Sequence, residues 1–236
     1  MKVLNSLAIA ALLGTAAQVA GQASNSGDLG EVVVTAQRAS QPFYRQDRPV
    51  VGLRRQADSV VLPIQISSDS RDEETRKREI QAVLLSALER AGGAGVELVV
   101  GDFALVPVTR ASAKEMLYFG AGRPDTSRVF LMVKAKLGGS TVAAQQRIDV
   151  FIKGMPRSGR ALLEPNGGPS LTIINPDQYR DAIVKLVAEH TARYAAMFGP
   201  DYRATVSGIS GQVQWSQVSG SEVFLFIPYT YSIVAK

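Results

Sequence analysis

Residues 60–91 read VVLPIQISSDSRDEETRKREIQAVLLSALERA, and they place a β-prone segment directly before a strong helix pattern. Residues 60–66 are mostly β-branched, and Pro63 among them predicts a sheet edge or a bulge, because proline has no N–H to donate. Ser70 and Glu73 then have the form of a capping box, and apolar residues recur after them at helical spacing. The apolar residues on this face are Ile80, Val83, Leu84, Leu88 and Ala91. We therefore expect a strand followed by a long helix.

The rest of the chain continues to mix strand and helix patterns. Further strands are predicted at residues 96–108, 128–137, 204–218 and 222–234. Residues 141–152 fit both periods, of which the helical one is favoured, and a Pro-Asn-Gly-Gly turn predicts a hairpin over residues 159–174. Asn175 as N-cap and Pro176 in the first helical position begin a last helix. This order predicts an α+β fold, an antiparallel sheet with two or three helices packed on it.

The N-terminal residues have the form of a cleaved leader. Lys2 precedes an apolar run at residues 7–13 that is shorter than a membrane-spanning helix, and Gly21 and Ala23 stand where a signal peptidase reads small residues. We predict a signal peptide of residues 1–23 and export to the periplasm, with outer-membrane association as an alternative. No later segment is long and apolar enough to predict a transmembrane helix.

Composition divides the remaining chain into two parts. Residues 24–49 are mostly polar around one short apolar patch, which predicts a flexible arm, and residues 50–236 are predicted to form one folded domain. Cysteine is absent, which excludes disulfides, thiolate zinc sites and a lipidated cysteine. The formal net charge is +5 and the basic residues are scattered, so nucleic-acid binding is not expected.

The sequence offers little catalytic chemistry. His190 is the only histidine, and on the apolar face of the last predicted helix it is interpreted as a packed or interface residue rather than a base or ligand. Glycine-rich residues 92–95 and 120–122 lack the lysine and the element order of a phosphate-binding loop. Aromatic residues near the C-terminus are interpreted as strand core or an oligomer contact, with a binding groove as the alternative; they are Phe224, Phe226, Tyr229 and Tyr231. We predict no catalytic residue, metal or cofactor, with an enzyme of unrecognised type as the alternative.

Residues 50–236 resemble the SIMPL-domain family of bacterial exported proteins. The resemblance rests on a strand pair before the capped helix of residues 71–91, on the strand at residues 98–108, and on a late alanine-rich helix followed by Gly199 and two strands. The helix carries Ala182, Ala188, Ala192, Ala195 and Ala196. This resemblance implies a SIMPL-like fold in a periplasmic or envelope protein that assembles into homo-oligomers, is linked to stress protection and has no known set of catalytic residues.

The apolar patch of the arm has a resemblance of its own. Residues 31–38, EVVVTAQR, resemble the TonB box and plug start of TonB-dependent outer-membrane receptors. In those receptors the segment adds a strand to the sheet of TonB, and main-chain hydrogen bonds supply the affinity. The resemblance implies a partner-binding segment of Glu31, Val32, Val33, Val34, Thr35 and Ala36. A chance apolar patch, or a strand that folds back on the domain, is the alternative.

These observations favour a non-enzymatic binding or assembly protein of the periplasm, whose arm docks TonB or an outer-membrane receptor by β-augmentation. The alternative is a stress-protective SIMPL-type oligomer that acts through the folded domain alone.

Overall fold

The computed structural model describes residues 30–34, 51–116, 118–120 and 125–236. The largest sheet consists of β1 (Glu31–Val34), β3 (Ser59–Ser68), β4 (Glu97–Val100), β5 (Ala104–Pro107), β6 (Phe119–Gly120), β7 (Ser127–Lys136), β8 (Leu162–Pro165) and β9 (Ser170–Ile174). Six of these strands form a ring in the order β7-β4-β5-β1-β9-β3, and β3 pairs with β7 along its full length. The fold is therefore built on a closed six-stranded β-barrel with antiparallel pairing.

The expected α+β fold, an antiparallel sheet with helices packed on it, is wrong, because the sheet closes. The closing strand is β1, which lies between β5 and β9. Its residues belong to the segment that the sequence assigned to an arm, so the predicted sheet was left with open edges. Strand β1 pairs Glu31 with Leu105 on one side and with Ile174 on the other, contacts that no local pattern encodes.

The hairpin expected over residues 159–174 is also wrong. Strands β8 and β9 both pair with β3, one after the other. Residues 166–169 lie between them and bulge opposite Leu62 and Pro63, where the Asn166 N–H donates to the Pro63 carbonyl oxygen at 2.8 Å. Pro63 therefore lies in neither an edge strand nor a bulged one: it pairs with Met132 in a regular ladder, and the interruption between β8 and β9 on its other side lets a strand that contains proline lie between two partners.

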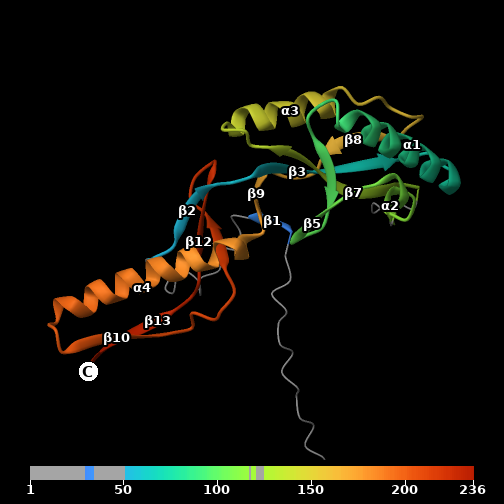
Figure 1. Cartoon of the computed structure of the whole chain (residues 1–236). Helices are drawn as coiled ribbons and strands as arrows, with labels where there is room; N and C mark the ends of the chain where they lie inside the picture. Colours follow the sequence, from blue (N-terminus) through green and yellow to red (C-terminus); the bar gives the residue numbers. More distant parts are fainter. Residues whose placement is uncertain (1–29, 35–50, 117, 121–124) are drawn as a thin grey trace, which may run out of the picture.

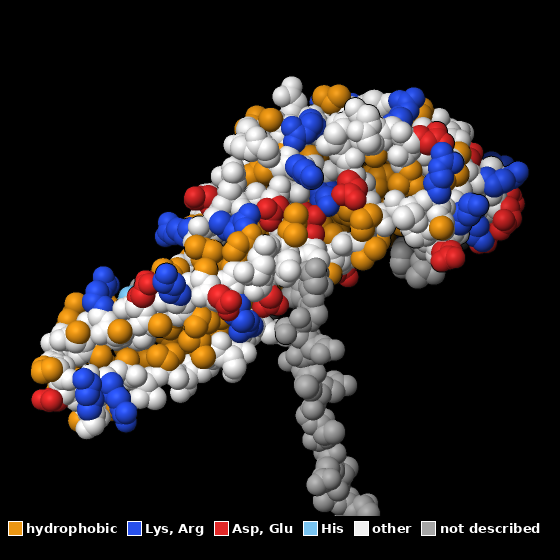
Figure 2. Space-filling model, in the orientation of Figure 1, with side chains coloured by type: hydrophobic (Ala, Val, Ile, Leu, Met, Phe, Trp, Pro, Cys, Tyr) orange, Lys and Arg blue, Asp and Glu red, His pale blue; other side chains and the backbone are white. Residues whose placement is uncertain are grey.

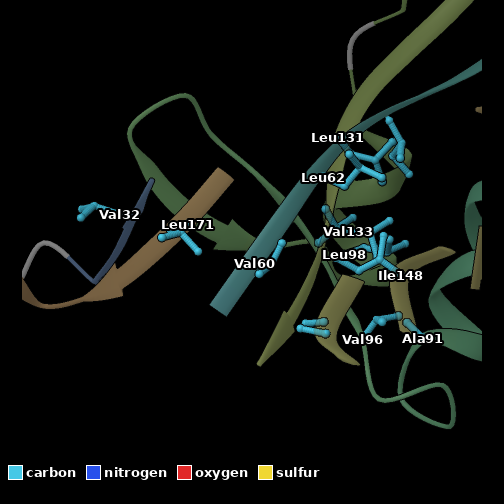
Figure 3. Packing of buried hydrophobic residues seen from close by; sticks show 14 of the residues in the cluster. Val32, Val60, Leu62, Ala91, Val96, Leu98, Leu131, Val133, Ile148 and Leu171 are labelled. Atoms are coloured by element: carbon cyan, nitrogen blue, oxygen red, sulfur yellow. The ribbon is translucent and has the colours of Figure 1, made fainter. Parts of the chain in front are cut away.

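Side chains alternate between the inside and the outside of the barrel. Val61, Val99 and Leu105 form a small inner cluster, with Val33 and Met132 packed against it. The larger core lies outside, where α1 (Glu73–Ala91) and α3 (Thr141–Lys153) cover β3 and β7, and α2 (Arg110–Lys114) contacts α1. Figure 3 shows part of this outer core, including Leu62, Leu98, Leu131, Val133 and Ile148. It also shows Val32, Leu171 and Val60, which lie on β1, β9 and β3.

The helices form close to where the sequence placed them. Helix α1 is capped by Asp72, whose carboxylate accepts a hydrogen bond from the Thr75 N–H at 2.7 Å, rather than by Ser70. The ambiguous segment at residues 141–152 is helical, as favoured, and the Ser140 hydroxyl caps it. Across the described residues, no helix combines the length and apolarity that crossing a membrane requires.

The C-terminal part forms a separate projection beside the barrel. Strand β2 (Leu53–Gln56) pairs with β12 (Glu222–Phe226), which pairs with β11 (Gln214–Gln217). Beyond this sheet, a 3-10 turn (Pro176–Tyr179) leads into α4 (Arg180–Met197), which lies on a ribbon of β10 (Tyr202–Ser207) and β13 (Thr230–Ala235). We call α4, β10 and β13 the lobe. Figure 1 shows the lobe extending away from the barrel.

Candidate interaction surfaces

The described part of the predicted TonB-box-like segment lies inside the barrel wall. Glu31–Val34 form β1 and pair with β9 at every position, while Glu31 and Val32 also pair with β5. Val32 and Val34 are fully buried in the outer core. Thr35 and Ala36 lie outside the described residues. The structure therefore brings four of the six predicted partner-binding residues together, with both strand edges already hydrogen-bonded.

A buried ion pair anchors β1 from the inside of the barrel. Lys134 Nζ lies 2.5 Å from Glu31 Oε2 and 2.7 Å from Glu97 Oε2. The Thr172 hydroxyl donates a hydrogen bond to the other oxygen of Glu31. Burial disfavours the Lys134 ammonium, but hydrogen bonds and charge attraction from Glu31 and Glu97 outweigh it and raise the pKa of Lys134. This arrangement keeps Lys134 charged and fixes the register of β1, since a shift of one residue would remove Glu31 from the interior.

The lobe has two unlike sides. Toward β13, the rings of His190 and Tyr194 are tilted at 48° with their centroids 4.5 Å apart, and the ring centroids of Tyr194 and Tyr231 are 6.5 Å apart, so aromatic groups occupy that side. Toward β10, the helix carries small residues, and an open groove of about 490 Å³ remains between helix and strand. The groove is lined by Ala188, Thr191, Ala192, Ala195, Ala196, Gly199, Pro200, Tyr202, Arg203, Ala204, Val206 and Lys236.

Large apolar side chains gather at the free end of the lobe. Met197 is 69% exposed and Phe198 is 61% exposed, and the Phe198 ring contacts the ring of exposed Tyr202. Val234, which pairs with Arg203, is exposed as well, and exposed Tyr231 lies farther along β13, opposite Val206. Figure 2 shows hydrophobic side chains running along the lobe between α4 and the ribbon. The groove and the exposed end are therefore neighbouring parts of one apolar surface.

His190 lies on α4, where the sequence placed it, and its ring packs against Tyr194. Its Nδ1 is buried, and within the described part of the chain no group hydrogen-bonds to it. The described residues also contain no group of three or more histidine or acidic side chains that could hold a metal ion. The packing contact agrees with the interpretation of His190 as a packed residue.

A polar cluster beside α1 has a structural explanation. The hydroxyls of Ser68 and Ser70 both donate to the carboxylate of Glu79, at 2.5 Å and 2.9 Å to its Oε2. Burial acts to raise the pKa of Glu79, but these hydrogen bonds outweigh it and lower the pKa. Arg160 and Asp69 form an exposed ion pair nearby, at the rim of a second hollow. These contacts hold the end of β3 and the start of α1 together.

The groove of the lobe is the feature that sequence reasoning missed. Its signal was present, because the alanines at positions 188, 192, 195 and 196 recur at helical spacing. Alanine is the strongest helix former, and its methyl group is too small to fill a gap between a helix and a strand. The pattern therefore indicates a helix without showing what its face contacts.

Comparison with known proteins gave no match, either to a protein-family model or to a curated protein. The resemblances to the SIMPL-domain family and to the TonB box therefore stay predictions.

Proposed function

We propose that this protein is a non-enzymatic binding or assembly protein of the cell envelope that acts through the lobe of its folded domain. The observation that carries this proposal is the exposure of Met197, Phe198 and Tyr202 beside an apolar groove. Contiguous apolar surface of this kind marks interaction sites in soluble proteins, and aromatic residues and methionine are enriched in interface cores.

The chemistry of the groove supports binding rather than catalysis. Its helical wall consists of alanine methyl groups and the Thr191 side chain. The Thr191 hydroxyl donates to carbonyl oxygens of its own helix, and the Lys236 ammonium donates to the Pro200 carbonyl oxygen, so both groups are engaged within the protein. With Tyr202 and Arg203 on its strand side, the groove offers a partner shape, apolar contact and one guanidinium group.

The test is site-specific photocrosslinking in intact cells. A photoreactive residue in place of Phe198 is expected to give a discrete species of higher mass. The matched control replaces Val142, which is 77% exposed on α3 and far along the chain from the lobe, and it should give no such species. Equal labelling at both positions, or none at Phe198, would contradict a binding role for the lobe.

A second proposal retains TonB as a partner through residues 31–38. Its support is the β-prone sequence, which forms a strand, and its requirement is that β1 leaves the barrel to pair elsewhere. Val33 pairs with Thr172, so a Val33→Cys/Thr172→Cys disulfide would hold β1 in place in a chain without other cysteines.

The Val33→Cys/Thr172→Cys variant gives a reversible test of that docking, because its disulfide can be formed and reduced. A TonB C-terminal domain is titrated into the oxidised and the reduced forms of the same variant. Binding only after reduction would support docking by a released β1. No binding in either form, or equal binding in both, would remove the docking proposal.

A further inference from the structure

We propose that the partner of the lobe is a second copy of this chain, paired along β10 in a two-fold symmetric dimer. This inference rests on the proposed function, because it names the occupant of the same surface. The dimer would join two ribbons into one four-stranded antiparallel sheet, with both α4 helices on the same face. Three features of the lobe lead to this arrangement.

The first feature is a free strand edge with usable hydrogen-bonding groups. Strand β10 pairs with β13, and no other strand in the described residues pairs with it. The Lys236 N–H donates to the Asp201 carbonyl oxygen at 2.8 Å, and these two residues continue the β10–β13 register. Because hydrogen-bonded and non-hydrogen-bonded pairs alternate in an antiparallel ladder, the backbone groups of Tyr202, Ala204 and Val206 point to the free edge.

The second feature is that this edge is complementary to itself. A two-fold axis beside Ala204 sets Ala204 against its copy and Tyr202 against Val206 of the copy, so all three edge-pointing residues exchange hydrogen bonds. The same register keeps side chains on matching faces, because residues directly opposite in a ladder share a face. Tyr202, Ala204 and Val206 line the groove in each copy, so one ladder brings two grooves together.

The third feature is the space left between helix and strand. An axis perpendicular to the sheet places the two grooves face to face. Helix α4 lies closer to β10 than to β13, so pairing two β10 edges brings the two helices side by side across the axis. Helices pack at 8–10 Å, and small side chains allow the closer distances. The exposed alanines at positions 188, 192 and 196 would then contact the second helix across the axis.

The size of the surface reaches the lower limit of a biological interface. Helix α4 has 18 residues, so it is about 27 Å long. A helix layered on a sheet presents a side roughly 20 Å high, which gives about 540 Å² per copy and roughly 1,100 Å² in total. That area exceeds the roughly 1,000 Å² expected of a biological interface. The opposite side of the lobe, next to β13, is occupied by Tyr194 and Tyr231, whose ring centroids lie 6.5 Å apart.

Cysteine crosslinking tests the register directly, because the natural chain has no cysteine. Ala204→Cys places a thiol beside the axis, where Cα atoms of hydrogen-bonded partners lie about 5.5 Å apart, within the range of a disulfide. Mild oxidation of the purified protein is expected to give a covalent dimer in most molecules. The control, Ala235→Cys, carries the same change on the other strand and should stay monomeric under denaturing conditions. Equal crosslinking of both variants would overturn the proposed edge.

Sedimentation equilibrium tests the role of α4. Ala192→Glu adds a charge to the groove on an exposed position, so the monomer should fold while the dimer weakens roughly 100-fold or more through like-charge repulsion across the axis. Ala182→Glu, also exposed on α4 but outside the groove lining, should leave the dimer unchanged. A monomeric natural chain at 100 micromolar would overturn the inference. If such a chain still gave a crosslinked species at Phe198 in cells, the lobe would bind a different partner and the proposed function would stand.

Discussion

Replacing Lys134 by methionine tests whether the buried ion pair holds β1 in the barrel. The side chains of Lys134 and Glu31 are 13% and 9% exposed, so Lys134→Met leaves the Glu31 carboxylate in the interior, where it still accepts a hydrogen bond from the Thr172 hydroxyl. Removing one member of a buried pair costs about 3–5 kcal/mol, because the other charge loses its compensation. Methionine keeps the length of the side chain, which limits the contribution of lost packing.

The expected loss lies near the lower end of that range. The other partner of Lys134, Glu97, is 45% exposed and regains water when the lysine is removed. We therefore expect Lys134→Met to lower the free energy of unfolding by about 3 kcal/mol, or the melting temperature by roughly 6–12 °C. Urea unfolding at pH 7 gives this quantity. The control is Lys77→Met, which removes an exposed ion pair from α1 and should change stability little.

The pH dependence supplies an independent check. The pKa of Lys134 is raised in the folded protein, so its stabilisation is fully present below the pKa of an unfolded lysine and is lost as pH rises through the folded pKa. The difference in stability between the natural chain and Lys134→Met should therefore be constant from pH 7 to about pH 10 and shrink above it. A variant as stable as the natural chain at pH 7, or a difference that already falls below pH 9, would refute the role of this ion pair.

Two further predictions concern other contacts. Gly52→Ala should destabilise the protein by a few kcal/mol in thermal unfolding, because a Cβ at Gly52 would lie 2.4 Å from the Leu225 carbonyl oxygen of β12. The control is Gly92→Ala, which has open space around its Cβ and should be neutral or slightly stabilising. Ser70→Ala removes a hydrogen bond to the Glu79 carboxylate and should lower the free energy of unfolding above pH 5. Because the pKa of Glu79 is lowered in the folded protein, this stabilisation is lost as pH falls through the folded pKa, so the natural chain and the variant should differ less in acid. Superimposable plots of stability against pH for the two proteins would contradict this.

The parts that sequence reasoning predicted well are those with local causes. The helical spacing of Ile80, Val83 and Leu84 places α1, and all three side chains are buried on its inner face. The capping box predicted at Ser70 and Glu73 was wrong, because the helix begins at Glu73 and its N-cap is Asp72. Ser70 turns instead to Glu79, a partner nine residues along the chain, and Asp72 takes the cap.

The barrel and the groove could not be predicted in the same way because their causes are distant in sequence. Glu31 meets Lys134 and Thr172, which are 103 and 141 residues away, and nothing near Glu31 in the chain identifies either partner. Closure of the sheet follows from these contacts. The groove depends on how far α4 lies from β10, which helical spacing does not specify.

The position of β1 also limits how tightly it could dock elsewhere. Releasing it exposes Val32 and Val34, which are fully buried, at a cost of about 1.5–3 kcal/mol each. A partner sheet can replace the backbone hydrogen bonds of β1, so the lost core packing and the separated ion pair make up the net cost. With a cost of about 5 kcal/mol, fewer than one molecule in 1,000 has β1 released and able to dock, and the apparent affinity for the partner is weakened by the same factor.

Lys134→Met removes the ion pair from the free-energy cost of releasing β1. If β1 docks TonB, this variant should bind a TonB C-terminal domain at least 10-fold more tightly than the natural chain in the same titration, and unchanged or weaker binding would show that docking does not proceed through release of β1.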